Sequence, residues 1–253
     1  MQILYVTDNS NCNPGTPTTF LFAYSNDFDA DLVNKFWNFF IINVISPHYV
    51  MFGSIRFDVR DKADFVFHDN IKNVNASIMA HQPDPSLGFG DLNTGSDVLD
   101  MTDRYLNVKS VPICGSKLII FVKRYPNQTE ITQLVSKLRQ YHVTFTILAS
   151  YESSGGSNPE ILITLASKVN GFCAFDTDSD IIPWGGIQMG LLNGEKIGYG
   201  YMSGNHDGDW QNANGVANYV SLSCKFYDFN SRRLLMRVFS RTNAPTDWMP
   251  YDD

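Results

Sequence analysis

The sequence predicts an α/β domain with a doubly wound, mostly parallel sheet, followed by a small β-rich domain. Short apolar runs recur along the chain, and most precede a stretch whose apolar residues keep helical spacing. The run at 117–123 (KLIIFVK) is continuously apolar, which is typical of a strand covered on both faces. Strands that alternate with helices favour a parallel sheet with right-handed crossovers.

The first strand and helix are predicted at residues 20–24 and 31–44, with a polar turn between them. The apolar stripe of this helix contains Leu32, Val33, Phe36, Trp37, Phe40, Ile41 and Val44. Asp27 and Asp29 lie in the polar turn, where we interpret them as turn and capping residues. In open parallel sheets, ligands bind beyond the carboxyl ends of the strands, so this turn is the first candidate site.

The elements that follow are read from the same signals. Two short strands are predicted at 50–58, ending at Asp58, and at 63–68, and we expect them to pair antiparallel because the turn between them is short. After these strands we expect a weak helix at 71–79, an exposed Pro- and Gly-rich loop at 81–95 and a helix at 96–107 capped by Ser96. Further strands are expected at 117–123, 143–150 and 172–176. Two helices lie between these strands: one is capped by Thr129, and the other starts at Asn158-Pro159 and ends before Gly171.

The pattern changes after residue 180, where glycines become frequent and strand signals return. A third strand is expected near 197–202, and the runs 218–228 and 234–241 predict a hairpin. Aromatic residues crowd this tail, and we expect them to form a core or a domain interface before they contact a ligand: Trp184, Tyr199, Tyr201, Trp210, Trp248 and Tyr251. The expected organisation is a lead-in segment at 1–17, an α/β domain at 18–181 and a small β-rich domain at 182–253.

Charge, hydropathy and cysteine content exclude some functions and favour one cellular compartment. A formal charge of −7 and a pI of about 5.1 argue against nucleic-acid binding, and no apolar run approaches the length of a membrane span. The first residues lack the charged region of a signal peptide. Two glycosylation sequons, at Asn75 and Asn127, and an even number of cysteines still favour secretion. We therefore expect an extracellular protein whose start in this sequence is incomplete.

The order of units resembles the von Willebrand factor A-like domain, a Rossmann-like fold. The segments TTFLFAYSNDFDADLV and ASKVNGFCAFDTD resemble one group of these domains more closely than the rest. This group is a nematode family of secreted A-like domains, which are often found beside C-type lectin domains. The resemblance covers about residues 18–180. It implies a non-enzymatic recognition or adhesion module, in innate defence or surface adhesion, whose partner is a protein or a glycan. It implies no nucleic-acid partner and no cofactor.

Adhesion-type A domains carry a metal site at the pattern Asp-x-Ser-x-Ser, completed by a Thr and a later Asp. Here Tyr24, Asn26 and Phe28 replace the three residues of that pattern, although Thr94 matches the loop Thr. Lys123 and Arg124 stand where the last Asp belongs, and cations repel a metal ion. We therefore expect no bound metal and a binding surface at the loops that contain Tyr24, Ser25, Asn26, Asp27, Thr94, Lys123 and Arg124.

Two alternatives stay open at this point. A shifted metal site could use Asp27, Asp29 and Asp91, since a hard divalent cation prefers oxygen ligands. A hydrolase of doubly wound type would need Ser25, Asp27 and His68 within hydrogen-bonding reach, although no nucleophile elbow accompanies them.

Four cysteines permit three pairings. In an A-like sheet the strands that follow Cys12 and Cys114 are parallel neighbours, so the resemblance implies a Cys12–Cys114 bridge. Cys173 would then pair with Cys224 and join the last strand to the tail, unless Cys173 is a buried free thiol.

Overall fold

The computed structural model describes residues 12–43, 48–178, 181, 187–192, 195–200, 248 and 251. In these ranges the strands are β1 (Thr18–Ser25), β2 (Tyr49–Phe57), β3 (Val66–His68), β4 (Lys117–Val122), β5 (Thr144–Ser150), β6 (Phe172–Asp176), β7 (Ile187–Leu192) and β8 (Glu195–Gly200). The α-helices are α1 (Ala30–Asn43), α2 (Ile71–Ala80), α3 (Val98–Leu106), α4 (Thr132–Gln140) and α5 (Glu160–Lys168), and a single 3₁₀ turn, η1, covers Pro85–Leu87.

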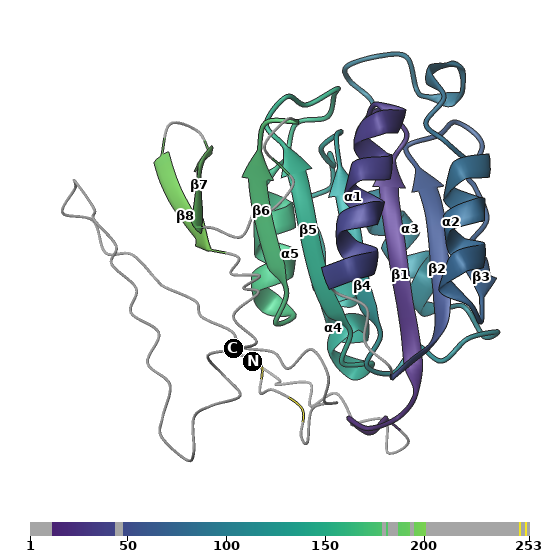
Figure 1. The fold of residues 1–253 in the computed structure, drawn as a ribbon. Helices are drawn as coiled ribbons and strands as arrows, with labels where there is room; N and C mark the ends of the chain where they lie inside the picture. The colour runs from purple at the N-terminus through teal and green to yellow at the C-terminus, as the bar shows by residue number, and fades with distance from the viewer. Residues whose placement is uncertain are drawn as a thin grey trace.

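The main sheet has the order β3-β2-β1-β4-β5-β6 (Figure 1). All neighbours pair in parallel except β2 and β3, which are antiparallel. The chain moves outward from β1 to β2 and then returns to place β4 on the other side of β1. This confirms the predicted doubly wound sheet, and the switch point lies between the carboxyl ends of β1 and β4.

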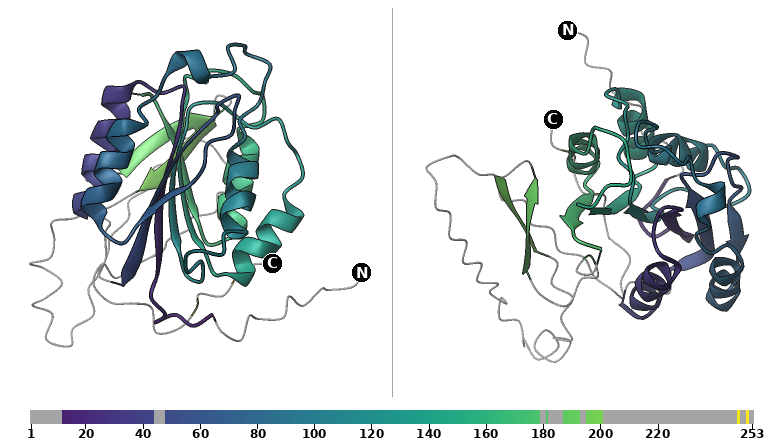
Figure 2. Two further views of the ribbon diagram at one scale, coloured as in Figure 1. Left: turned by 90° about the vertical axis from the view of Figure 1, so that its right-hand side faces the viewer. Right: turned by 90° about the horizontal axis from the view of Figure 1, so that it is seen from above.

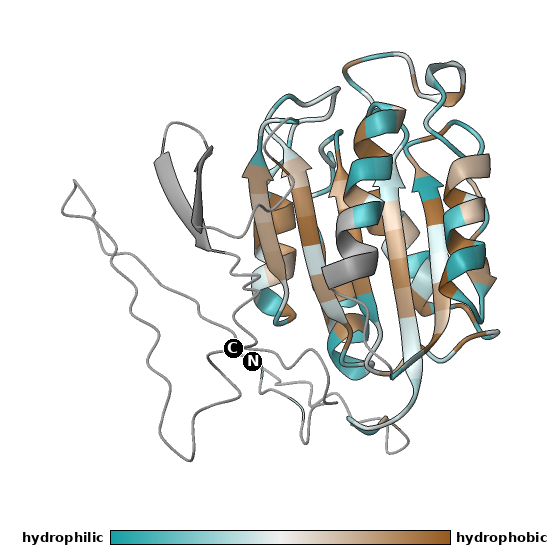
Figure 3. Cartoon of the chain, viewed as in Figure 1, coloured by the Kyte–Doolittle hydropathy of each residue, from teal (hydrophilic) through white to brown (hydrophobic). Residues whose placement is uncertain are grey.

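Helices cover both faces of the sheet, with α1 and α2 on one side and α3, α4 and α5 on the other (Figure 2). Alternate residues of β1 serve the two layers, because successive side chains of a strand point to opposite faces. Phe20 and Phe22 pack with the helices α1 and α2, whereas Leu21 and Ala23 pack on the opposite side. Figure 3 shows hydrophobic residues gathered in the strands and hydrophilic ones in the loops beyond them.

Several predicted boundaries shift by a few residues. Thr129 does not cap α4: the carboxylate of Glu130 accepts a hydrogen bond from the Thr132 amide instead. After α5 the left-handed residue is Asn170, with φ of 54°, and Gly171 follows it. Ser96 contributes to the start of α3 as expected, because its hydroxyl accepts from the Val98 amide, although Asp97 is the capping residue.

The predicted bridge between Cys12 and Cys114 is present, with a Cα–Cα distance of 5.3 Å. Its two cysteines precede β1 and β4, which the sheet places side by side. Cys173 is a buried free thiol, so the predicted bridge from Cys173 is not formed, and Cys224 lies outside the described residues. Burial in the apolar sheet raises the pKa of the Cys173 thiol, which makes it an inert core residue.

The end of the chain packs against this disulfide. The Trp248 indole stacks on the His142 ring at 4.4 Å between centroids and donates a hydrogen bond to the Cys12 carbonyl. Tyr251 lies under the Arg139 guanidinium at 4.9 Å. Trp248 and Tyr251 therefore pack against other residues of the same chain, as expected of an internal interface.

In the tail, β7 and β8 form a two-stranded antiparallel sheet of their own. The hairpin predicted at 218–241 lies outside the described residues, so the proposed β-rich domain stays a prediction. Within the part of the chain that the structure describes, no helix is long and apolar enough to cross a membrane.

Candidate functional site

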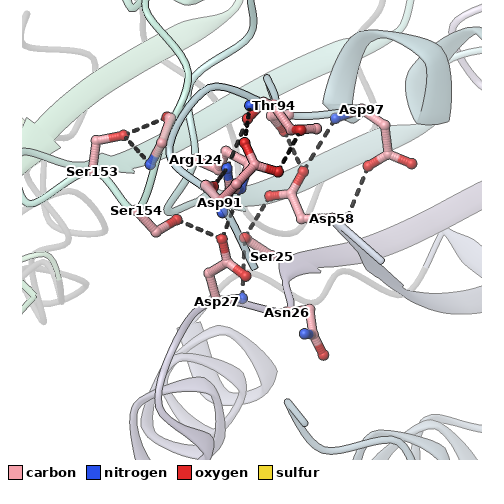
Figure 4. Close-up of polar contacts among 12 residues, drawn as sticks. Ser25, Asn26, Asp27, Asp58, Asp91, Thr94, Asp97, Arg124, Ser153 and Ser154 are labelled. Atoms are coloured by element: carbon pink, nitrogen blue, oxygen red, sulfur yellow. Dashed lines mark hydrogen bonds and ion pairs between the residues drawn. The ribbon is translucent and has the colours of Figure 1, made fainter. Parts of the chain in front are cut away.

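The candidate site lies where the chain leaves β1 and β4, at the switch point of the sheet. Ser25 ends β1, the turn after it supplies Asn26 and Asp27, and the segment after β4 supplies Lys123 and Arg124. Two further loops close over them, at 88–97 and 151–157 (Figure 4). The carboxyl ends of parallel strands lie at one edge of a sheet, and six of the seven predicted binding residues, all but Tyr24, lie in these segments.

Arg124 is the centre of this edge. Its Nε donates to the Asp27 carboxylate at 2.9 Å, and its Nη1 donates to the carbonyls of Asp91 and Thr94, each at 2.7 Å. Only 4% of its side chain is exposed. The guanidinium thus occupies the middle of the loops, where it neutralises an acid and holds two carbonyl groups at once.

The loop at 151–157 is shaped around this guanidinium. The Ser154 hydroxyl donates to the same Asp27 oxygen at 2.5 Å. A Cβ added at Gly155 would lie 2.2 Å from Nη1 of Arg124, so only glycine allows the backbone to approach this closely. Gly155 therefore makes room for the arginine, and Gly156 makes room for the Tyr125 carbonyl, which a Cβ would approach to 1.8 Å.

Lys123 faces away from Arg124 and holds the other side of the edge. Its Nζ contacts Asp178 at 2.6 Å, the Ser150 hydroxyl at 3.2 Å and Glu152 at 3.7 Å. Asp178 follows β6, so this ion pair ties the end of the last strand of the main sheet to β4. Both predicted cations, Lys123 and Arg124, are therefore paired with carboxylates, hydroxyls or carbonyls of this chain.

Tyr24 and Asn26 are structural at this edge. Tyr24 is buried, and its hydroxyl donates to the His81 carbonyl at 2.8 Å. Burial raises its pKa, since the apolar surroundings disfavour the phenolate. The Asn26 amide makes a reciprocal pair with the Asp84 backbone, at 2.9 and 3.0 Å. These two predicted binding residues therefore position the 81–90 segment.

Thr94 is a binding residue predicted from the sequence resemblance, but its hydroxyl is engaged within its own loop. It donates to the Asp91 carboxylate at 2.7 Å, and the amides of Asn93 and Thr94 bind the other Asp91 oxygen. These three hydrogen bonds lower the pKa of Asp91. Asp91 and Thr94 therefore form a closed turn of their own.

Asp58, which sequence reasoning treated as the end of a strand, is an unforeseen part of the site. Its carboxyl group is completely buried and forms hydrogen bonds with the hydroxyls of Ser25, at 2.5 Å, and Ser96, at 2.6 Å, and with the Asp97 amide at 3.1 Å. Its backbone has φ of 61°, a conformation that Asp tolerates better than most residues. The acid joins β1, β2 and the start of α3.

Asp58 makes the stability of the fold depend on pH. Burial, opposed by the Ser25 and Ser96 hydrogen bonds and reinforced by the charges of Asp97 and Asp27, raises its pKa from 3.8 to about 8. Between pH 4 and 8 the folded chain keeps a proton that the unfolded chain has released. The free energy of unfolding therefore falls as the pH rises through this range, by a few kcal/mol in order of magnitude.

The measurement is chemical denaturation from pH 4 to pH 9. The variant Asp58→Asn, which cannot ionise, is expected to flatten the decline. The variant Asp61→Asn, which removes an exposed carboxylate from the next turn, should retain it. Equal slopes for wild type and Asp58→Asn would contradict the role of this acid.

The shifted metal site is not assembled. Asp27 is engaged by Arg124 and Ser154, Asp29 accepts from the Asp31 amide at the start of α1, and Asp91 is closed by its own turn. Among the described residues, no three His, Cys, Asp or Glu side chains lie close enough together to hold a metal ion. The interpretation of Asp29 as a capping residue agrees with its hydrogen bond.

The hydrolase trio is not assembled either. The Ser25 hydroxyl binds Asp58, whereas the His68 ring binds the Ser77 hydroxyl at 2.7 Å. His68 pairs with Phe52 near the start of β2, while Ser25 pairs with Phe57 at its end. Five residues of extended strand, roughly 16 Å, separate these two positions.

The two sequons differ in their surroundings. Asn75 is exposed on α2, and its side-chain oxygen accepts a hydrogen bond from Trp37 at 2.9 Å. Asn127 is also exposed, but its Nδ2, the atom to which a glycan is attached, donates to the Asn93 carbonyl at 2.8 Å. Asn127 thus helps to hold the 88–97 loop.

No protein-family model and no curated protein matches this sequence. Solved structures with a similar fold include the human COPII-coat protein Sec24c, at 10% identity and a TM-score of 0.47 over 68% of this chain and 30% of that chain. The VWA domain of SpRpn10 matches at 12% identity and a TM-score of 0.41, over 66% of this chain and 94% of that domain. These values add no argument about function.

Proposed function

We propose that this chain is a non-enzymatic recognition module of the von Willebrand factor A type, which binds a protein or glycan partner without a metal ion. The partner meets the loops at the carboxyl edge of the sheet, at 24–29, 88–95 and 123–127. The observation that carries this proposal is the buried ion pair of Arg124 with Asp27. A divalent cation at this place would have to displace a guanidinium that already satisfies one carboxylate and two carbonyls.

The same arrangement supports a rigid recognition surface. In a metal-dependent module the loops are completed by the ion and the partner's carboxylate. Here Arg124, Asn127 and Gly156 hold the 88–97 loop through its own carbonyl groups. Preorganised loops bind with a smaller loss of conformational entropy. Nucleophilic catalysis would require an accessible nucleophile with a base within hydrogen-bonding reach. The Ser25–Asp58 pair is completely buried, and the trio considered from the sequence is dispersed.

We further propose that the module is secreted, with the A-type domain at 18–181 and a β-rich domain at 182–253. The Cys12–Cys114 disulfide supports an oxidising compartment. Glycans are then expected at Asn75 and Asn127, and the sequence resemblance favours a role in innate defence or surface adhesion.

Cross-linking mass spectrometry on the chain secreted from animal cells tests this function. Partner cross-links are expected at the three edge loops, with equal yield in EDTA and in millimolar calcium and magnesium. Cross-links that appear only with divalent ions would favour the metal-dependent alternative. Cross-links confined to the opposite end, near Trp248, would contradict recognition at the carboxyl edge. The same sample reports the glycans and the disulfide.

A further inference from the structure

The loop at 91–94 has all four of its carbonyl groups turned inward. Those of Asp91 and Thr94 accept from Arg124, that of Leu92 accepts from the Gly156 amide at 3.0 Å, and that of Asn93 accepts from Asn127 at 2.8 Å. On the outer side, the amides of Asn93 and Thr94 are bound by Asp91. The backbone of this loop is therefore held from both sides.

This rigid backbone presents an aliphatic side chain to solvent. Leu92 is 74% exposed, the largest exposure among the large hydrophobic residues in the described ranges. Leu87, on the same 81–97 connection, is 39% exposed. Between them in sequence, Phe89 lies half-buried with the Arg124 guanidinium 5.4 Å from its ring. An apolar side chain carried on a backbone that is already held loses less conformational freedom on binding than one on an unsupported loop, which favours an interface anchor.

The charges around this anchor are unequal. The cation Arg124 is buried and Lys123 is mostly covered, with side chains 4% and 12% exposed. The acids of the same loops face outward: Asp91 is exposed, and 62% of the Glu152 side chain is accessible. Within the described ranges, Arg60 is an exposed cation that contacts this region, because it binds the Ser86 carbonyl. The exposed acids Asp91 and Glu152 therefore lie on the loops at this edge, Asp91 next to Leu92 in sequence, and the exposed cation Arg60 lies beside Leu87.

We propose that Leu92, supported by Leu87, is the apolar anchor of the carboxyl edge, and that its partner is a protein with an apolar pocket rimmed by basic side chains. This inference rests on the proposed recognition function and names its partner class. The exposed acids of the edge disfavour an anionic membrane surface. A second copy of a chain with net charge −7 is disfavoured for the same reason.

A random peptide library displayed on phage is the probe, panned on the immobilised whole chain at low salt. The enriched peptides are expected to combine a large apolar residue with Lys or Arg. The variant Leu92→Asp should weaken their binding by about tenfold or more. The variant Met79→Asp is the matched control, because Met79 is 53% exposed on α2, and it should bind like wild type. Higher salt should also weaken binding, because the edge carries exposed acids.

The outcomes separate this inference from the proposed function. Peptides that lose binding to Glu152→Lys but not to Leu92→Asp would overturn the anchor and leave recognition at the edge intact. Peptides that are indifferent to both variants, or a library that yields no binder, would count against both. Enrichment of acidic peptides would overturn the basic partner. Leu92→Asp should unfold at the wild-type temperature, so that lost binding reports the surface.

Discussion

Replacing Arg124 with methionine is expected to lower the free energy of unfolding by roughly 3–5 kcal/mol, because a buried charge would lose its partner. The Asp27 carboxylate, which is 13% exposed, would remain in place with one hydroxyl donor. The carbonyls of Asp91 and Thr94 would also lose their donor. Methionine retains much of the apolar volume, so the loss reports charge and hydrogen bonds rather than a cavity.

Urea denaturation at neutral pH measures this change. Lys62→Met is the matched control, since Lys62 pairs with Asp100 at 2.7 Å but 53% of its side chain is exposed, and its loss should cost less than about 1 kcal/mol. The double variant Asp27→Asn with Arg124→Met should recover part of the stability, because it leaves no unpaired charge. A loss for Arg124→Met no larger than that for Lys62→Met would contradict the central role of this arginine.

Removing the Cys12–Cys114 disulfide is the second large effect. The bridge spans a sequence separation of 102 residues, and closing a loop of that length stabilises a fold by about 4–5 kcal/mol in the chain-entropy description. Two contacts add to it, because Trp248 donates to the Cys12 carbonyl and packs over Gly115. The double variant Cys12→Ser with Cys114→Ser is therefore expected to unfold at much lower denaturant concentration.

Addition of reductant provides the internal check on this prediction. The wild type and Cys173→Ala should both lose stability when a dithiol is added, because Cys173 is a free buried thiol in this fold. The variant that lacks Cys12 and Cys114 should not respond. A wild type whose midpoint is unchanged by reductant would show that the bridge contributes little to stability.

The elements of the fold could be predicted because their signals are local. The continuous apolar run at 117–123 requires burial on both faces, and β4 lies at the centre of the sheet. The stripe that contains Val33, Phe36 and Trp37 covers β1, as its spacing indicates. Errors occurred where side-chain hydrogen bonds decide an end, as at Glu130 in place of Thr129.

The site was foreseen only in outline. Polar and charged residues after β1 and β4 had to meet, since parallel strands end at one edge. Sequence position could not tell that Arg124 turns inward to Asp27 while Lys123 turns toward Asp178. Asp58 was missed because it follows an apolar strand without a break, and its buried partners Ser25 and Ser96 are 33 and 38 residues away along the chain.

The sequence by itself determined the order of strands and helices and the absence of the adhesion-type metal pattern at the first turn, because both depend on residue types at short spacing. Only the tertiary structure decided which charges pair, which loop is held rigid and which leucine faces solvent. Those outcomes depend on the distance between loops that are far apart in sequence. The strength of an ion pair or hydrogen bond is set by that distance and by burial, which no local pattern records.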